Sequence, residues 1–255
     1  MSSPTWTPAA LSSEARPLAG TGWRLVEAQH KVSTLKLVDT LEEQDLLERL
    51  IERTKPPVPE GCRGLHYLLA TPFRYDAPYP SGSRFRRAGM TPGVFYAAEA
   101  VETAVAELAF YRLLFYAESP QTPWPANPAE YTAFSAAFGT GMGLDLTQPP
   151  LSDDAAAWSH PTDYGACQTL ADYAREAGIQ AIRYTSVRDP ARGAALALLD
   201  CAAFRAMAPA AFQTWRIYLR ATGVQALCEF PNLRLEFGRA TFTADPRLEA
   251  MRWER

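Results

Sequence analysis

Residues 83–107 read SRFRRAGMTPGVFYAAEAVETAVAE, and this stretch decides both the fold and the candidate site. It opens with three closely spaced arginines: Arg84, Arg86 and Arg87. A turn marked by glycine and proline follows, then a short apolar strand that ends at Tyr96, then a helix that carries Glu107. The stretch therefore predicts a basic loop, a strand and a helix in succession, each with a polar side chain suited to a binding site.

These three kinds of side chain suit the binding and cleavage of a dinucleotide. An arginine can hold a pyrophosphate through two parallel charge-assisted hydrogen bonds. A tyrosine can stack on a flat ring, and a single carboxylate can stabilise an oxocarbenium-like ribose, as it does in glycoside hydrolysis. We therefore expect a site that breaks a glycosidic bond.

Glu107 is the least ordinary residue of the set, because it is the only charge in TAVAELAFY, residues 103–111. A helix that is apolar nearly all round is buried, and an unpaired carboxylate is costly to bury. Glu107 is therefore functional, or pairs with an arginine of the core, or lies where the helix edge reaches water. The arginines have the alternative of a solvated loop, and Tyr96 that of an ordinary core position.

A second polar segment, SVRDPARG at residues 186–193, follows a predicted buried strand. Ser186 at the strand end can bond a ribose or phosphate oxygen, or it is an ordinary turn serine. Arg188 and Arg192 could add phosphate contacts, and Asp189 could pair with one of them.

A long loop, residues 71–88, precedes the first strand of the site and is rich in Pro, Gly, Ser and Arg. Loops of this length in compact domains are usually functional. We therefore expect Arg74 and Tyr75, in TPFRYD, to line the same pocket as Arg84 and to bind substrate.

In this order, the site residues resemble those of the RES domain, which is named for its Arg, Glu and Ser: Arg84, Tyr96, Glu107 and Ser186. The segments TPFRYDAPYPSGSRF, GVFYAAEAVETAVAELAFYRLLF and IRYTSVRDPARGAALALLD support the resemblance. It covers roughly residues 65–204, and it is closest to the longer RES proteins. One departure is Gly193-Ala194-Ala195, where many RES proteins carry an asparagine shortly after the serine.

The resemblance implies an α+β fold similar to that of ADP-ribosyltransferases, with a core of short, largely antiparallel strands and flanking helices. It implies a toxin of an Xre–RES toxin–antitoxin pair that consumes NAD as a substrate and needs no other cofactor. RES proteins phosphorolyse or hydrolyse NAD, or transfer ADP-ribose to a protein, so the acceptor stays open among phosphate, water and a side chain. The expected partner is an Xre-type antitoxin protein in a hetero-oligomer.

The same resemblance implies a role for each residue. Arg84 would hold a phosphate of NAD, and Tyr96 would stack on nicotinamide or position its ribose. Glu107 would bind the ribose hydroxyls and stabilise the charge that develops at the anomeric carbon. Two alternatives remain: a mono-ADP-ribosyltransferase that modifies a host protein, and a non-catalytic nucleotide-binding protein.

Composition limits the other classes. The chain has 255 residues, a net charge of −3 and a pI near 5.7, so no general basic field for nucleic acid is expected. Four scattered cysteines without a CxxC, and three dispersed histidines, predict neither a zinc site nor a disulfide framework. No secretory signal is visible, and the best apolar stretch is interrupted by Glu107 and Arg112, so a cytoplasmic protein without a membrane span is expected.

Two units are predicted, an N-terminal helical extension (residues 1–60) and a catalytic domain (residues 61–255). Residues 1–20 are expected to be loosely ordered or to lie on the surface of the protein. A capping box of Thr40 and Glu43 begins a helix that Lys55-Pro56-Pro57 ends. Further helices are expected at residues 99–117 and 164–177. Strands are expected at residues 23–25, 65–70, 93–97, 131–138, 179–185, 195–199, 212–222, 224–230 and 232–237.

Overall fold

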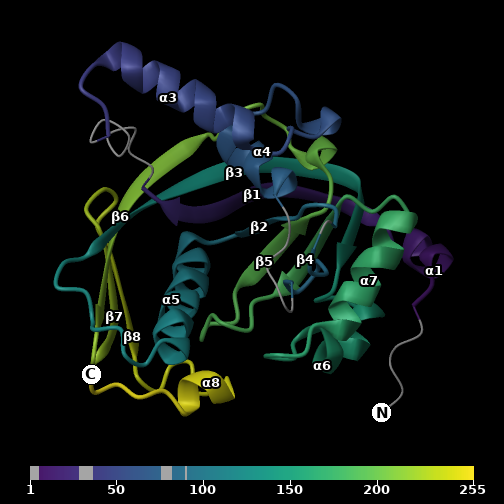
Figure 1. Ribbon diagram of the computed structural model, residues 1–255. Coiled ribbons are helices and arrows are strands. Elements are labelled where there is room, and N and C mark those ends of the chain that lie inside the picture. Colours follow the sequence, from purple (N-terminus) through teal and green to yellow (C-terminus); the bar gives the residue numbers. More distant parts are fainter. Residues whose placement is uncertain (1–5, 29–36, 76–81, 90) are drawn as a thin grey trace.

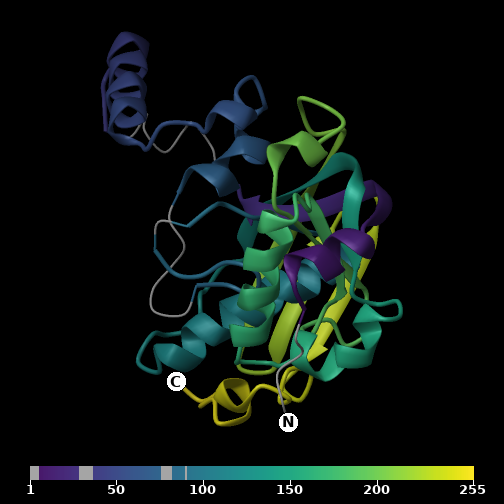
Figure 2. The same cartoon turned by 90° about the vertical axis from the view of Figure 1, so that its right-hand side faces the viewer.

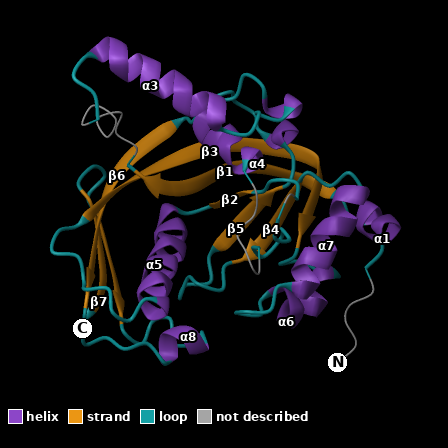
Figure 3. Ribbon diagram, viewed as in Figure 1, coloured by secondary structure: helices purple, strands orange, loops and turns teal. Residues whose placement is uncertain are grey.

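The computed structural model describes residues 6–28, 37–75, 82–89 and 91–255. Helices and one eight-stranded sheet are mixed along the chain, which makes the fold α+β as predicted (Figure 3). The strands are β1 (Arg16–Glu27), β2 (Phe95–Ala98), β3 (Ala129–Asp145), β4 (Ala181–Thr185), β5 (Ala194–Leu198), β6 (Ala211–Arg220), β7 (Gly223–Cys228) and β8 (Leu233–Gly238). The α-helices are α1 (Pro8–Ser13), α3 (Leu41–Thr54), α4 (Tyr67–Arg74), α5 (Val101–Glu118), α6 (Ala155–Trp158), α7 (Gly165–Glu176) and α8 (Pro246–Glu249).

The sheet follows the order β1-β2-β5-β4-β3-β6-β7-β8, and β1 also pairs with β3. β1 is antiparallel to β3 along nearly its whole length and meets β2 at one position, where Trp23 pairs with Ala98. That bridge closes β1, β2, β5, β4 and β3 into a circuit. All the pairings are antiparallel except β3 with β4, so the predicted antiparallel character is confirmed.

Helix α5 lies inside the fold, with β6, β7 and β8 on one side of it and β2, β5 and β4 on the other (Figure 1). Sheet or helix covers α5 on most sides, and this burial suits side chains that are apolar nearly all round the helix. Val105, Ala109, Phe110 and Leu113 are at most 1% exposed and pack into the core with Trp215. The same burial brings the charged Glu107 into the interior.

A second core lies under α7 and α1. Leu170, Ala171 and Ala174 on α7 are buried with Leu11 of α1. Gly178 follows α7 with a φ of +74°, the left-handed conformation that glycine adopts readily after a helix.

The N-terminal part of the chain confirms one prediction and corrects another. Thr40 and Glu43 form the capping box of α3, and the helix ends before Pro56. Residues 1–5 lie outside the described residues. From residue 8 onward the expectation of loose order is wrong, whereas the alternative of a surface segment fits, since Leu11 is the one buried residue between residues 8 and 20. There α1 is capped by Thr7, and β1 begins at Arg16, because β3 supplies the backbone partners for this segment.

The predicted strand at residues 65–70 is wrong, because α4 begins at Tyr67, within this range. The side chain of His66 accepts a hydrogen bond from the Leu68 amide and starts the helix, while Leu68 and Leu69 reach the core. A short apolar run fits either a strand or a buried helix, and the pattern alone does not distinguish the two.

The two predicted units share one sheet. Helix α3 stands away from the sheet, as expected of an extension (Figure 2). However, β1 also lies within residues 1–60, and it belongs to the central sheet.

Cysteine pairing also differs from the prediction. Cys62 and Cys201 form a disulfide with a Cα–Cα distance of 5.4 Å, so sequence spacing concealed a pair that the fold brings together. Within the described residues, no group of His, Cys, Asp and Glu could hold a metal ion. No helix in the described part of the chain is long and apolar enough to cross a membrane.

Candidate functional site

A cavity of about 410 Å³ lies at the inner face of the sheet beside α5. Four of the predicted site residues line it: Arg84, Tyr96, Glu107 and Arg188. They come from a loop, a strand, a helix and a second loop, which are distant in the sequence. The fold therefore gathers the core of the predicted set around one space.

Glu107 and Ser186 form the centre of this site. The Ser186 hydroxyl donates a hydrogen bond to Oε1 of Glu107 over 2.5 Å, and Ser186 is fully buried. Burial raises the pKa of Glu107, while the Ser186 bond and the positive charges of Arg188 and Arg84 act in the opposite direction. The carboxylate is thus held in a fixed orientation at the wall of the cavity.

Backbone amides of the 186–193 loop fix the serine in turn. Its Oγ accepts hydrogen bonds from the amides of Arg188 (3.2 Å) and Asp189 (3.1 Å), so the hydroxyl proton points to Glu107. Asp189 binds the loop to α5 by accepting a hydrogen bond from Thr103 (2.7 Å). A Cβ at Gly193 would lie 2.1 Å from the Thr103 hydroxyl oxygen, so glycine is required there.

Arg84 is a buried cation, 7% exposed, whose hydrogen-bond partners are mostly neutral carbonyls. It donates to the carbonyl oxygens of Trp158 (2.6 Å) and His160 (3.1 Å). Its guanidinium also lies 4.9 Å from the ring centroid of Tyr164. No carboxylate pairs with Arg84 among the described residues, so its positive charge is available to an anion in the cavity.

Tyr96 positions the loop that carries Arg84. Its hydroxyl lies 2.9 Å from the Ser83 hydroxyl and accepts a hydrogen bond from the Phe85 amide over 2.9 Å. Burial raises the pKa of the phenol, which therefore stays neutral near pH 7. The ring lines the cavity while the hydroxyl holds the neighbouring backbone.

Arg188 also lines the cavity, but its charge is already paired. It forms an ion pair of 3.1 Å with Asp245, and the two side chains are 4% and 1% exposed. It also donates to the carbonyl of Pro161 and lies 3.8 Å from the ring centroid of Phe110. Asp245 comes from the C-terminal segment, so that segment fixes one wall of the site.

The other arginines of the first loop have structural partners. Arg86 is buried and donates to the carbonyls of Thr91 and Tyr75, which orders the loop. Arg87 is half-exposed and pairs with Asp172 on α7 at 2.7 Å. Of the three arginines in this loop, Arg84 is the one that lines the cavity.

Three residues predicted to bind substrate are not among those that line the cavity. Arg74 pairs with Glu52 of α3 at 2.6 Å, because α4 directs it toward the extension. Tyr75 follows α4 and gives its carbonyl to Arg86. Arg192 is exposed in the turn after Asp189, with a φ of 57°.

Sequence reasoning missed several lining residues, and Arg24 is the most important. It lies on β1, donates to the carbonyl of Tyr96 over 2.9 Å, and has no carboxylate partner among the described residues. Burial lowers its pKa to about 10, so it remains a cation at neutral pH. Other missed lining residues are Trp23, Tyr111 and Tyr184. Nothing in GTGWRLVE linked this strand to the site, because the link is a pairing across the sheet.

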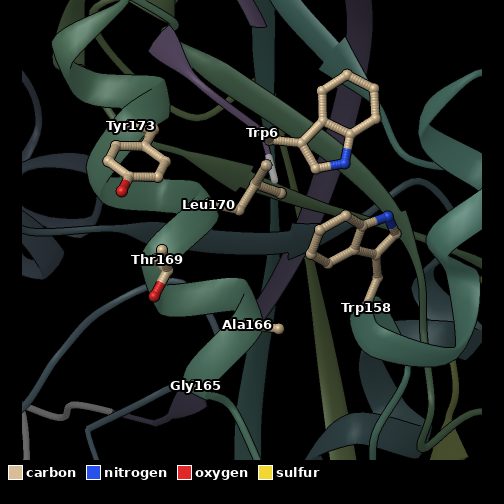
Figure 4. Close-up of a pocket in the computed structure, with 7 residues that line it drawn as sticks. All are labelled: Trp6, Trp158, Gly165, Ala166, Thr169, Leu170 and Tyr173. Carbon is tan, nitrogen blue, oxygen red and sulfur yellow. The ribbon is translucent and has the colours of Figure 1, made fainter. Parts of the chain in front are cut away.

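A second pocket, of about 100 Å³, lies between the N-terminal segment and α7 (Figure 4). Trp6, Trp158, Leu170 and Tyr173 line it, and the Trp6 indole donates to Asp154 over 2.8 Å. It contains none of the predicted site residues.

Comparison with known protein families shows which family the chain belongs to. The RES domain family model matches residues 58–220, more than half of the chain, and it spans Arg84, Tyr96, Glu107 and Ser186. The α+β fold and this match together define the class of protein. The chain belongs to the RES domain family.

Among solved structures, the chain is similar to one described as the crystal structure of the M.tuberculosis MbcT-MbcA toxin-antitoxin complex. The TM-score is 0.41 and the identity 13%, over 92% of this chain and 95% of that chain. No curated protein matches this chain.

Proposed function

We propose that this protein binds NAD in the 410 Å³ cavity and cleaves its nicotinamide–ribose bond. The observation that carries the proposal is the Glu107 carboxylate, held by Ser186 at 2.5 Å at the wall of a cavity that Arg84 and Arg24 also line. Neither arginine has a carboxylate partner among the described residues. The cations suit a pyrophosphate, and the carboxylate suits a ribose that gains positive charge. Membership of the RES domain family supports the same chemistry.

In the proposed reaction, the bond between the anomeric carbon and the nicotinamide nitrogen breaks, and its electron pair stays on the nitrogen. Nicotinamide leaves as a neutral molecule, because it is a cation while it is attached to the ribose. Glu107 stabilises the oxocarbenium-like ribose until water, phosphate or a protein side chain attacks. An attacking water or side chain loses a proton to solvent or to a base.

The raised pKa of Glu107 gives this reaction an acid limb. The carboxylate form stabilises the transition state, so activity should fall as the pH drops through the raised pKa. The fall in activity should occur at a higher pH than the ordinary pKa of a glutamate, since burial, which raises the pKa of Glu107, is the largest influence on this group.

In the cell, we propose that the protein acts as the toxin of a toxin–antitoxin pair, with an Xre-type antitoxin that covers the cavity. An acidic or C-terminal carboxylate segment of such a partner could pair with Arg84 and Arg24. Co-expression of a neighbouring small protein should then relieve growth arrest and lower NAD loss. A partner that binds the protein tightly but leaves NAD turnover unchanged would show that neutralisation of the toxin does not act at this cavity.

The direct test is to incubate the purified protein with NAD and to follow free nicotinamide, with and without phosphate. Nicotinamide release that requires phosphate indicates phosphorolysis, and release without it indicates hydrolysis. ADP-ribose that appears on added host protein supports the mono-ADP-ribosyltransferase alternative. NAD binding without any release supports the non-catalytic nucleotide-binding alternative.

A further inference from the structure

Helix α3 has three exposed leucines, and two of them, Leu46 and Leu50, lie on one face. Leu46 is 50% exposed and Leu50 is 48% exposed. They lie four residues apart, roughly 40° around the helix, and so form one stripe. The helix turns inward at Gln44, which is buried and lies roughly 120–160° around the helix from the two leucines. Leu47 and Ile51 lie between the two faces and are partly buried. In Figure 2, α3 stands away from the sheet.

The two ends of this stripe carry charges of opposite sign. Glu42 lies roughly 40° to one side of Leu46, near the start of the helix, and Arg53 lies roughly 20° to the same side, near its end. Both are exposed. The stripe therefore runs from an acidic end, over two leucines, to a basic end.

We propose that this stripe binds the same stripe on a second copy of the chain, with the two α3 helices antiparallel about a twofold axis. The midpoint between Leu46 and Leu50 coincides, within one residue, with the midpoint between Glu42 and Arg53. One antiparallel register therefore places Leu46 against Leu50 of the second copy and Glu42 beside Arg53 of the second copy, twice over. A parallel arrangement would put like charges side by side.

The argument for a second copy is this self-complementarity, because a twofold interface requires one patch to match itself. One helix from each subunit buries less than the ~1,200 Å² of a standard stable interface, so the dimer should form reversibly as concentration rises. This inference goes beyond the proposed function and does not depend on it, since α3 contributes no residue to the cavity.

The experiment is sedimentation velocity on the full chain from low micromolar to several hundred micromolar. The wild type should shift from one to two copies across that range. The double variant Leu46→Ser/Leu50→Ser should remain a monomer. The matched control is Leu227→Ser, an exposed leucine on β7 that is 38% exposed, and it should dimerise as the wild type does. Circular dichroism checks that each variant is folded.

Charge reversal then tests the register. Glu42→Arg and Arg53→Glu should each raise the dimer dissociation constant roughly three- to tenfold, because each replaces two attractive pairs by two repulsive ones. The double reversal should bring the constant back toward that of the wild type. A wild type that stays monomeric at every concentration overturns the proposal and leaves the stripe to a different protein. A dimer that survives the leucine substitutions, or whose single reversals are not rescued by the double one, overturns it as well.

Discussion

The two loops that meet at the cavity both carry a buried arginine, but the two side chains have different partners. Arg84 in the first loop is surrounded by the carbonyl oxygens of Trp158 and His160. Arg188 in the second loop is paired with Asp245 at 3.1 Å. The charge of Arg84 therefore remains available to an anion, whereas the charge of Arg188 is already paired within the fold. Equal residue type and equal burial do not imply equal roles, and the partner decides.

The largest expected effect tests the paired side of this comparison. Asp245→Ala should destabilise the protein by about 3–5 kcal/mol, because it leaves Arg188 buried without its partner. Urea unfolding measures the change. The matched control is Asp172→Ala, which breaks the exposed pair with Arg87, 47% and 49% exposed, and should cost at most about 1 kcal/mol. Similar losses in both variants would show that burial does not distinguish the two pairs.

The second prediction concerns the carboxylate between the loops. Glu107→Gln should lower the rate of nicotinamide release by about 10²–10³, because the charge that stabilises the transition state is lost while size and the Ser186 contact are kept. The control is Glu102→Gln, an exposed position on the same helix, which should keep wild-type turnover. A Glu107→Gln variant that retains more than about a tenth of the activity would exclude the catalytic role.

The third prediction compares arginines within the first loop. Arg84→Ala should weaken NAD binding by about 2–3 kcal/mol, because a buried charge-assisted contact to phosphate is lost. Arg87→Ala should leave binding nearly unchanged, since its side chain faces Asp172. Titration calorimetry on a Glu107→Gln background measures both. Equal effects would indicate a diffuse basic loop in place of a defined phosphate site.

The smallest expected effect concerns the stability of the folded protein. Burial raises the pKa of Glu107 in the native state above its unfolded value, so the native state favours the protonated form. Stability therefore falls as pH rises from the ordinary pKa of a glutamate through the raised one. Glu107→Gln removes this cost, so its Tm at pH 7 should exceed that of the wild type, by roughly 2–4 °C for each kcal/mol recovered. Calorimetry at pH 7 and near pH 4.5 tests this, since the difference should shrink at the lower pH. A lower Tm at pH 7 would indicate that Glu107 stabilises the fold as a paired charge.

The sequence by itself determined the elements whose signals are local. The capping box of Thr40 and Glu43 and the prolines after Lys55 set the limits of α3. The nearly uniform apolar character around Glu107 predicted a buried helix with a carboxylate inside it. Arg84, Tyr96 and Glu107 could be predicted as a set because they follow one another within one short segment.

Only the tertiary structure decided which charges are paired and which are available. Asp245 lies 57 residues from Arg188, and Arg24 reaches the cavity from a strand outside the residues that match the family. Arg74 faces Glu52 because α4 replaces the expected strand and loop. Cys62 and Cys201 meet across 139 residues. These pairings depend on strand order and helix direction, which long-range packing fixes, whereas capping, proline stops and helical periodicity act within a few residues of the chain.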